Sequence, residues 1–465
     1  MHVLICGGGV IGASIAYFLS RRGVKATVLE STGLACAASG KSGGFLARDW
    51  CDGSPLGPLA RRSFALHAEL AEQIGEDWGY RRLDTYGGYC GFPHGEAPHE
   101  LAWLSSDVAV SQALGSREDT AQVHPGQFTA AMMRGAQAQR AELRIGRVTG
   151  IRQHAGQAVG VEIDGEPLDG DSIVIAMGPW SVLAALWLPL PAIFGLKGHS
   201  LVFDTGEAVP PEAVFLEYRE EGGSVLSPEL FPRSDGTTYV CAISSEEPLP
   251  LDPAAVMPQP GAIERLEAMC AALSPALGSA PILARQACFR PVTADGLPLI
   301  GRVPGVANAY VATGHSVWGI LNAPATGEAI AELIVDGATR SVDLLSFDPA
   351  RLPRLDPART AARVAAAARP EGRAVLCPGQ FAAASLSCVF VSKSLASCRS
   401  SSCSDGWPAV RLTMRPRLTA GRAQICSVQR MTFLYSCTLR NSAPPYELNF
   451  TNPPYQGQIA MSAMV

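Results

Sequence analysis

The first thirty residues alternate apolar and small positions in an order that predicts a strand, a helix and a second strand. Residues 3–6 form a short apolar run that ends at a glycine cluster, as buried strands do. A helix is expected to begin near Val10, and "KATVLE" after it predicts a second strand that ends in Glu30. This order indicates the first unit of an α/β fold.

A related order recurs between residues 282 and 337. "ILARQACFRP" predicts a strand that Pro291 ends, and Asp295 with Gly296 carries a turn signal. "NAYVATG" predicts another strand, and "SVWGILNAPATGEAIAELIVDG" predicts a helix with Gly337 as its C-cap. A second helix start is therefore expected after a strand and a glycine, without the glycine spacing of the first.

The middle of the chain predicts short strands separated by glycine and proline. The runs are "GLKGHSLVF", "AVFLEY", "SVLSPELFPR" and "TTYVCAI", with a hairpin turn at "PRSDGTT". They favour an antiparallel sheet, and "AIERLEAMCAALSPAL" predicts an amphipathic helix beside it. Polar side chains on these strands could face a substrate, and no pattern chooses among Lys197, His199, Glu217, Tyr218 and Tyr239.

The length of 465 residues exceeds what one hydrophobic core usually supports, so at least two domains are expected. We assign a discontinuous nucleotide-binding domain to residues 1–60, 120–185 and 286–352. Residues 61–119 and 186–285 are assigned to a substrate or cap domain, and 353–465 to a linker and an extension that is expected to be disordered.

The segment 370–465 differs in composition from the rest of the chain. It holds nine lysines and arginines against three acids, and six of the 13 cysteines. Two interpretations remain open, a basic partner-binding segment and a poorly ordered extension. No function is inferred from it.

Composition and charge exclude several function classes. The chain is 47% hydrophobic and 17% charged with a net charge of −5, which argues against nucleic acid as the main partner. No apolar run is long enough for a membrane span, and a strand pattern at the start favours the absence of a signal peptide. The scattered cysteines show no metal-ligand spacing, so no metal site is expected, and a reducing compartment such as the cytoplasm is favoured, with an organelle left open. Oligomeric state is not indicated.

The glycine cluster has the spacing of a dinucleotide-binding turn. Gly7 permits a tight strand-to-helix turn, Gly9 lets the backbone approach a diphosphate, and Gly12 lets the helix pack on the strand. Val10 and Ile11 begin a helix whose amides point at the diphosphate. Glu30 is placed to accept hydrogen bonds from a ribose and disfavours a 2′-phosphate. The pattern does not choose between FAD and NAD.

A second loop of small residues, "ACAASGKSGGFLA", follows the second predicted strand. Exposed amides around Ser39, Lys41, Ser42 and Gly43 would suit a second contact with phosphate or with the edge of a flavin. The composition alone is equally typical of a surface loop.

Five segments in this order and spacing resemble the D-amino-acid oxidase family, which includes glycine oxidase and sarcosine oxidase. They are the glycine turn, the small-residue loop, "DSIVIAMGPWS", "CFRPVTADGLPLIG" and "YVATGHSVWGILNAPATGEAIAELI". The resemblance covers about residues 1–352 and is greatest to a little-characterised eukaryotic branch of FAD-dependent oxidoreductases. It implies a Rossmann-like FAD-binding domain of the glutathione-reductase type with a second, mainly antiparallel substrate domain.

The resemblance also implies roles for individual residues. The glycine turn would hold ADP, Val148 would face the adenine, and Ala176 with Gly178 would let a strand end pass under the cofactor. The small-residue loop would lie by the diphosphate and flavin. The second helix start would line the pyrimidine edge of the flavin with Gly314, His315, Ser316, Trp318, Gly319 and Ile320. Fixed amide donors there stabilise the negative charge of reduced flavin, to which a protonated His315 would add; a hydrogen-bonded structural histidine is the alternative.

Two residues of "CFRP" are assigned by the same resemblance. Arg290 occupies the place of an arginine that binds the substrate carboxylate through two parallel hydrogen bonds. Cys288 stands where sarcosine oxidases attach FAD covalently, whereas the neighbouring residues resemble the glycine-oxidase type, which has no such bond. A buried free thiol is therefore the favoured alternative for Cys288.

The resemblance implies an FAD-dependent oxidoreductase that oxidises the C–N bond of a small amine or amino acid. Hydride would pass from the carbon beside a neutral amine nitrogen to flavin N5, the imine would hydrolyse, and oxygen or another acceptor would reoxidise the flavin. Such a route requires orientation and electrostatics more than a side-chain base. An NAD-linked dehydrogenase, a flavin monooxygenase using NADPH, and a flavin-binding scaffold in trafficking or assembly are the alternatives.

Overall fold

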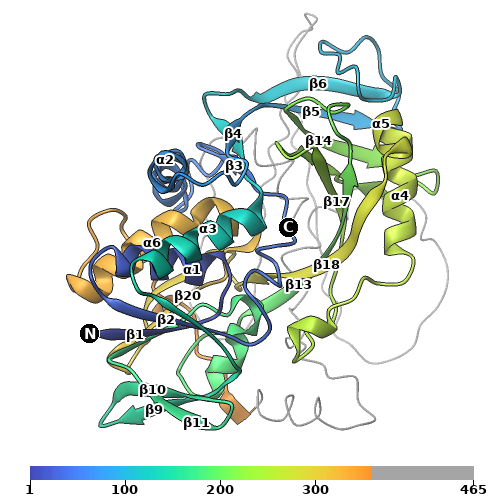
Figure 1. Cartoon of the computed structure of the whole chain (residues 1–465). Coiled ribbons are helices and arrows are strands. Elements are labelled where there is room, and N and C mark those ends of the chain that lie inside the picture. The colour runs from blue at the N-terminus through green and yellow to red at the C-terminus, as the bar shows by residue number, and fades with distance from the viewer. Residues whose placement is uncertain (359–465) are drawn as a thin grey trace, which may run out of the picture. The chain divides into compact units, whose positions relative to one another are not determined.

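The computed structural model describes residues 1–358, and its strands form four sheets (Figure 1). The predictions for residues 370–465, and for the linker beyond residue 358, lie outside the described residues. Two of the sheets, one of six strands and one of eight, position most of the candidate functional residues. In the described part of the chain, no helix has the length and apolar character that crossing a membrane requires.

The six-stranded sheet is parallel except at one edge. In spatial order its strands are β19 (Leu299–Arg302), β20 (Ala309–Thr313), β12 (Ser172–Ile175), β1 (His2–Cys6), β2 (Lys25–Glu30) and β8 (Glu142–Ile145). Only the β19–β20 pair within this sheet is antiparallel. The central strands are buried along nearly their whole length, as expected for a parallel sheet covered on both faces.

Different layers cover the two faces of this sheet. One face packs against α1 (Val10–Ser20), α3 (Pro125–Ala138) and α6 (Gly319–Val335), with α2 (Gly57–Ile74) packed against α6. The other face packs against the antiparallel strands β9 (Val148–His154), β10 (Gln157–Ile163) and β11 (Glu166–Asp169). Side chains of β1 alternate between the layers: Val3 and Ile5 join the helical core, and Leu4 and Cys6 join the other.

The eight-stranded sheet is mainly antiparallel. Seven strands in spatial order are β18 (Ile282–Val292), β13 (Phe194–Asp204), β17 (Thr237–Ser245), β16 (Glu229–Pro232), β14 (Glu212–Arg219), β5 (Asp84–Cys90) and β6 (Val108–Gly115), and β15 (Val225–Leu226) pairs with β14. Only β5 and β14 run parallel. Its outer face packs against α4 (Ala262–Leu273) and α5 (Pro275–Ser279), so the predicted amphipathic helix is confirmed as α4.

The remaining elements are short. A linking sheet contains β3 (Phe45–Ala47), β7 (Thr120–Gln122) and β4 (Arg81–Arg82). The 3-10 helices are η1 (Gly178–Leu186), η2 (Pro253–Ala255), η3 (Ser316–Trp318), η4 (Leu345–Phe347) and η5 (Pro349–Arg351).

The local predictions near the first helix agree with the structure, and one prediction near residue 290 is wrong. The helix begins at Val10 and the second strand ends at Glu30. Pro291, however, lies inside β18, paired with Gly195, and does not end the strand. Because β18 is an edge strand, a residue without an amide hydrogen can be accommodated there.

The predicted turn at Asp295 and Gly296 connects the two large sheets. The Asp295 carboxylate accepts a hydrogen bond from the Leu297 amide at 3.2 Å and forms an ion pair with Arg351 at 2.7 Å. Gly296 has a φ of +75°. The turn therefore carries the chain from β18 of one sheet into β19 of the other.

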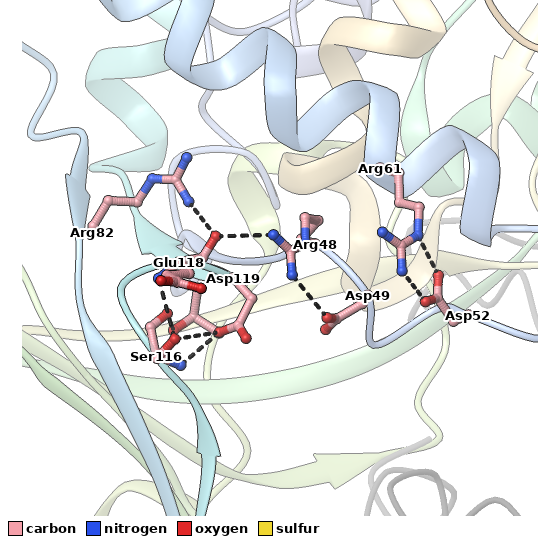
Figure 2. A network of polar contacts seen from close by, with 9 residues as sticks. Arg48, Asp49, Asp52, Arg61, Arg82, Ser116, Glu118 and Asp119 are labelled. Carbon is pink, nitrogen blue, oxygen red and sulfur yellow. Dashed lines mark hydrogen bonds and ion pairs between the residues drawn. The ribbon is translucent and has the colours of Figure 1, made fainter.

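An exposed polar network joins the segment before α2 to the turn before β7 (Figure 2). The Glu118 carbonyl accepts hydrogen bonds from Arg48 Nη1 at 3.4 Å and Arg82 Nη1 at 3.0 Å. Arg61 of α2 forms an ion pair with Asp52. The network ties the linking sheet to its neighbours and contains no predicted site residue.

Strands from distant parts of the chain share the six-stranded sheet. Its members come from residues 1–30, 142–175 and 299–313, whereas the eight-stranded sheet is drawn from 84–115 and 194–292. The division into a cofactor domain and a cap domain at the boundaries given above stays a prediction.

Candidate active site

The glycine turn between β1 and α1 lies directly against the end of β12. Gly7 has a φ of +115°, and a Cβ there would stand 2.3 Å from the carbonyl oxygen of Ala176. A Cβ on Gly12 would stand 2.0 Å from the carbonyl oxygen of Gly7. Both positions therefore require glycine, and the bare backbone of the turn lies at the positive end of the α1 dipole.

Two side chains hold this turn. Glu30, which is 9% exposed, accepts hydrogen bonds from the Gly8 amide at 2.7 Å and the Thr32 amide at 2.9 Å. Ser39 Oγ accepts a hydrogen bond from the Val10 amide at 2.9 Å. The structure thus brings the predicted acid and the first serine of the small-residue loop to the start of α1.

The rest of the small-residue loop is held by polar side chains from other elements. The Ser42 carbonyl accepts a hydrogen bond from Arg233 Nη2 at 2.9 Å, and the Gly43 carbonyl accepts one from Gln122 Nε2 at 2.7 Å. Ser42 Oγ is buried and has no hydrogen-bond partner among residues 1–358. A buried hydroxyl of this kind is a donor and acceptor available to a ligand.

The same loop packs against one face of the eight-stranded sheet. Lys41 Nζ donates to the Ala287 carbonyl at 3.3 Å, and Gln286 Nε2 donates to the Lys41 carbonyl at 3.4 Å. A Cβ on Gly43 would stand 2.3 Å from the ring of Phe231. This face, which we call the inner face, is therefore the one turned toward the loop.

The ends of β1, β12 and β20 lie next to one another. The Ala176 amide donates to the Cys6 carbonyl at 2.8 Å, at the end of β1. Thr313 Oγ1 donates to the Gly178 carbonyl at 2.9 Å, immediately before Gly314. The small residues Ala176 and Gly178 are thus placed between the two helix starts.

Val148 lies apart from these strand ends. It is half-buried in β9, against the core on the face of the six-stranded sheet opposite the helices. The Gly146 amide two residues before it donates to the Glu30 carbonyl at 2.8 Å. The structure therefore connects the Val148 segment to the end of β2 that carries the acid.

His315 is buried and hydrogen-bonded, 3% exposed, with Nε2 3.1 Å from Thr326 Oγ1. Burial lowers the pKa of His315 to about 3, so the imidazole is neutral at neutral pH. The structure favours the structural alternative for this residue over a protonated group. Its Nδ1 has no partner within the described part of the chain.

The second helix start contains a proline in its first turns. The predicted residues Ser316 and Trp318 lie in η3, and Gly319 and Ile320 begin α6. Pro324 has no amide hydrogen, so it leaves the carbonyl of Ile320 without a helical partner. His67 Nε2 lies 3.0 Å from that carbonyl oxygen and donates to it.

A second side chain of α2 completes this arrangement. Ser63 Oγ accepts a hydrogen bond from the Ala325 amide at 3.1 Å, which frees the Leu321 carbonyl. His67 Nε2 also lies 3.2 Å from the Leu321 oxygen. Burial lowers the pKa of His67 to about 4, so it donates as a neutral ring. Sequence reasoning missed both α2 residues.

Arg290 lies on the inner face of the sheet with unused donor capacity. Its Nη2 donates to Ser244 Oγ, and its guanidinium lies over Gly198, whose Cβ position would be 3.8 Å from Nε. Arg290 Nε is buried and has no hydrogen-bond partner within residues 1–358. A half-buried guanidinium with free donors is suited to an anionic ligand.

Cys288 lies on the same face, two residues before Arg290. Burial raises the pKa of its thiol, and the charges of Arg290 and Lys41 offset this only in part. The thiolate is the nucleophilic form of cysteine. This environment therefore favours the unreactive buried thiol over covalent attachment, and the question stays a prediction.

Of the five polar candidates named from the middle of the sequence, Tyr239 is the one that is buried on the same face as Arg290. It is buried on the inner face, where its ring stacks on that of Phe231 with centroids 6.2 Å apart. Lys197 and His199 are buried on the opposite face, where Lys197 forms an ion pair with Glu247. Two further candidates lie elsewhere: Glu217 is exposed and Tyr218 packs against the outer core.

Sequence reasoning also missed Glu229, Cys241 and Arg233, which lie on or beside the inner face. The alternation in "PELFPR" and "TTYVCAIS" places Glu229 with Phe231, and Tyr239 with Cys241, on common faces. That signal becomes useful only when the pairing of the two strands is known.

The described residues fit a dinucleotide cofactor that ends in a flavin. The glycine turn exposes backbone at the start of α1, and the unpartnered Ser42 hydroxyl lies in the next loop. The inner face with Arg290 and the start of α6 are connected to that loop and to the end of β12. These features define the class of a two-sheet, dinucleotide-binding oxidoreductase.

The family model described as FAD dependent oxidoreductase, DAO, matches residues 2–333, and the chain belongs to this family. The family assignment inferred from the sequence is confirmed, as are the α/β fold class and the enzyme class. The cofactor is FAD, so the NAD alternative left open by the glycine turn is resolved. The roles of individual residues stay predictions.

The alignments with individual relatives cover nearly the whole length of each relative. Protein C1F5.03c of Schizosaccharomyces pombe is 30% identical over 386 residues, covering 75% of this chain and 97% of the relative. Glycine oxidase of Pseudomonas putida is 27% identical over 378 residues, covering 75% of this chain and 98% of the relative. The crystal structure of glycine oxidase from Geobacillus kaustophilus has a TM-score of 0.63 at 26% identity, covering 75% of this chain and 97% of that one.

Proposed function

We propose that this FAD-dependent oxidoreductase oxidises the C–N bond of a small amino acid or amine, with Arg290 as the group that binds a substrate carboxylate. The observation that carries the proposal is the half-buried guanidinium on the inner face, with one side-chain hydrogen bond to Ser244 and an unpartnered Nε. A guanidinium binds a carboxylate through two parallel hydrogen bonds, which fixes the orientation of the substrate.

The residues that would hold FAD follow from the contacts above. The glycine turn and the start of α1 would bind the diphosphate, and Glu30 would bind a ribose hydroxyl. The small-residue loop and the start of α6 would contact the flavin end. When bound, FAD supplies the acceptor for the hydride that leaves the carbon beside the amine nitrogen.

The protein's own contribution is orientation and a preorganised field. The start of α6 presents the positive end of a helix dipole, held in place by His67 and Ser63. Because His315 is neutral, the charge there comes from backbone amides and not from the imidazole. Phe45 stacks on Phe231 with centroids 5.2 Å apart, so aromatic rings cover part of the inner face.

Relatives support the amino-acid class. The relative from Pseudomonas putida and the solved structure from Geobacillus kaustophilus are both glycine oxidases by name.

The test compares two arginines of β18. Arg290→Ala should lower kcat/KM for the best substrate by about 100-fold while FAD content stays unchanged, because charge-assisted hydrogen bonds to the substrate are lost. Arg285→Ala is the matched control, since Arg285 is exposed and paired with Glu267 of α4 on the outer face. The substrate panel is small amino acids and N-methyl amines, followed by peroxide formation and by reduction of an artificial acceptor.

Two results would overturn the proposal. One is FAD-loaded wild-type protein that oxidises no member of the panel with either acceptor, which would favour the flavin-binding scaffold. The other is undiminished turnover in Arg290→Ala.

A further inference from the structure

An acidic side chain, Glu229, lies on the same inner face as Arg290 and within range of its charge. Glu229 begins β16, and its partner across the strand pair is Cys241 of β17. Cys241 Sγ donates a hydrogen bond to Glu229 Oε2 at 3.5 Å. A thiol is a weak donor, so this contact satisfies the carboxyl group only in part.

Register places Glu229 and Arg290 on the same face. Cys241 pairs with Ser200 of β13, and Ser200 pairs with Gln286 of β18. Arg290 follows Gln286 by four residues along the strand, and side chains two apart share a face. The acid and the arginine therefore lie on one surface, separated by strands β17 and β13 in the sheet order.

The charge of Arg290 acts on Glu229 without an ion pair between them. Burial raises the pKa of the Glu229 carboxyl, and the Arg290 guanidinium offsets part of that rise. Among the described residues no ion pair joins them, and Arg290 makes its side-chain hydrogen bond to Ser244. Both side chains are half-buried, so each charge is partly desolvated and neither has a full charge partner.

A ligand that carries both charges would satisfy both groups at once. An amino acid zwitterion has a carboxylate and an ammonium group on adjacent atoms, in contrast to a simple amine or a carboxylic acid. We infer that Glu229 binds the ammonium group of the substrate while Arg290 binds its carboxylate, so that the enzyme selects amino acid zwitterions. This inference rests on the proposed function and narrows its substrate class.

The same position lets Glu229 remove a proton from the substrate ammonium group before oxidation. Oxidation beside nitrogen requires a neutral amine, whereas an amino acid is an ammonium ion near neutral pH. The Glu229 carboxylate can accept that proton: the ammonium N–H bond breaks, a carboxyl O–H bond forms, and the amine keeps the electron pair. The raised pKa of this half-buried carboxyl makes it a better proton acceptor than a fully exposed one.

The experiment uses Glu229→Gln in the full-length, FAD-loaded protein. Binding is read from the absorption change of bound FAD on titration, which needs no turnover. The probes are 2-aminoisobutyrate, a zwitterion with no hydrogen on Cα, and isobutyrate, the same skeleton without the ammonium group. Glu264→Gln is the matched control, because it removes an exposed acid from α4 on the outer face.

Glu229→Gln should weaken the binding of 2-aminoisobutyrate by about tenfold or more. The affinity for isobutyrate should stay unchanged or increase. Arg290→Ala should weaken the binding of both probes, and Glu264→Gln should change the binding of neither. An equal change for the two probes in Glu229→Gln, or no change, with FAD content and melting temperature at wild-type values, would overturn the inference and leave the proposed function intact.

The two probes could fail to bind because they differ in size from the true substrate, so the test includes a second pair of ligands. If wild-type protein oxidises an amino acid but binds neither probe, the KM of that amino acid and the inhibition constant of its deamino acid serve as the pair. If it neither binds the probes nor oxidises any amino acid or amine, the proposed function fails, and the inference fails with it.

Discussion

The two helix starts at the carboxyl edge of the six-stranded sheet are built in different ways. At α1, backbone lies against backbone: a Cβ on Gly12 would stand only 2.0 Å from the Gly7 carbonyl oxygen, which leaves no room for a side chain. At α6, Pro324 leaves a carbonyl without its helical partner, and His67 of another helix donates to it. The start of α1 depends on the absence of side chains, whereas the start of α6 depends on one buried side chain.

This difference decides what can be recognised in a sequence. The first start is local, because its glycines lie within six residues of one another. The second depends on a contact between residues 253 positions apart, and nothing near Pro324 indicates it. A helix start built from backbone contacts produces a glycine motif with fixed spacing in the sequence. A helix start held by distant side chains produces no motif, because the residues involved are far apart in the chain.

The largest expected effect comes from breaking the first start. Gly12→Ala places a Cβ 2.0 Å from a backbone oxygen, so the turn must move. We expect destabilisation of about 3 kcal/mol or more and loss of FAD, measured by unfolding and by flavin absorbance. Gly222→Ala is the control, because no atom lies within 4 Å of its Cβ position. Yellow Gly12→Ala protein with full FAD content would contradict the comparison.

The second start should respond to His67→Phe. The substitution keeps a buried ring and removes the donor, leaving the Ile320 and Leu321 carbonyls without it. We expect a loss of about 2 to 4 kcal/mol in the free energy of unfolding, with weaker FAD binding. Arg61→Ala on the same helix should change stability little, since Arg61 is exposed. Equal behaviour of the two variants would show that α6 does not need His67.

Low pH should destabilise the start of α6 more than the start of α1. Burial lowers the pKa of His67 to about 4 and of His315 to about 3, from 6.5. As pH falls below 6.5, the unfolded chain binds protons that the folded chain does not. Stability therefore falls toward acid, by about 1.4 kcal/mol per pH unit for each histidine. In His67→Phe the slope between pH 6 and 5 should be smaller by about that amount in urea unfolding; an unchanged slope would contradict the assignment.

The smallest effect is expected at Cys288, on the inner face of the eight-stranded sheet. Because burial raises the pKa of its thiol, we expect no covalent bond to FAD. Acid precipitation of wild-type protein should leave the yellow colour in the supernatant, and Cys288→Ala should retain wild-type FAD content. A yellow pellet from wild type that becomes colourless in Cys288→Ala would reverse this expectation.

Local elements of the fold could be predicted, and long-range pairings could not. The start of α1 at Val10 and the end of β2 at Glu30 follow from short-range periodicity. The pairing of β1 with β12 depends on packing between distant segments. Pro291 shows the limit of local rules, because its place in an edge strand is a property of the whole sheet.

The candidate site shows the same division. Arg290 and the glycine turn were found through motifs, but Glu229 has no motif. Its proximity to Arg290 depends on the register of four strands, which the alternation of side chains alone does not determine. His315 was found in sequence, whereas its neutral state follows only from its burial.

The order of strands in the six-stranded sheet also bears on biosynthesis. β1 leaves the ribosome first, yet its partner β12 begins at Ser172, and β20, which pairs with β12, ends at Thr313. Synthesis must therefore reach at least Thr313 before this sheet can close, and its apolar strand edges stay open to chaperones or to aggregation in the meantime.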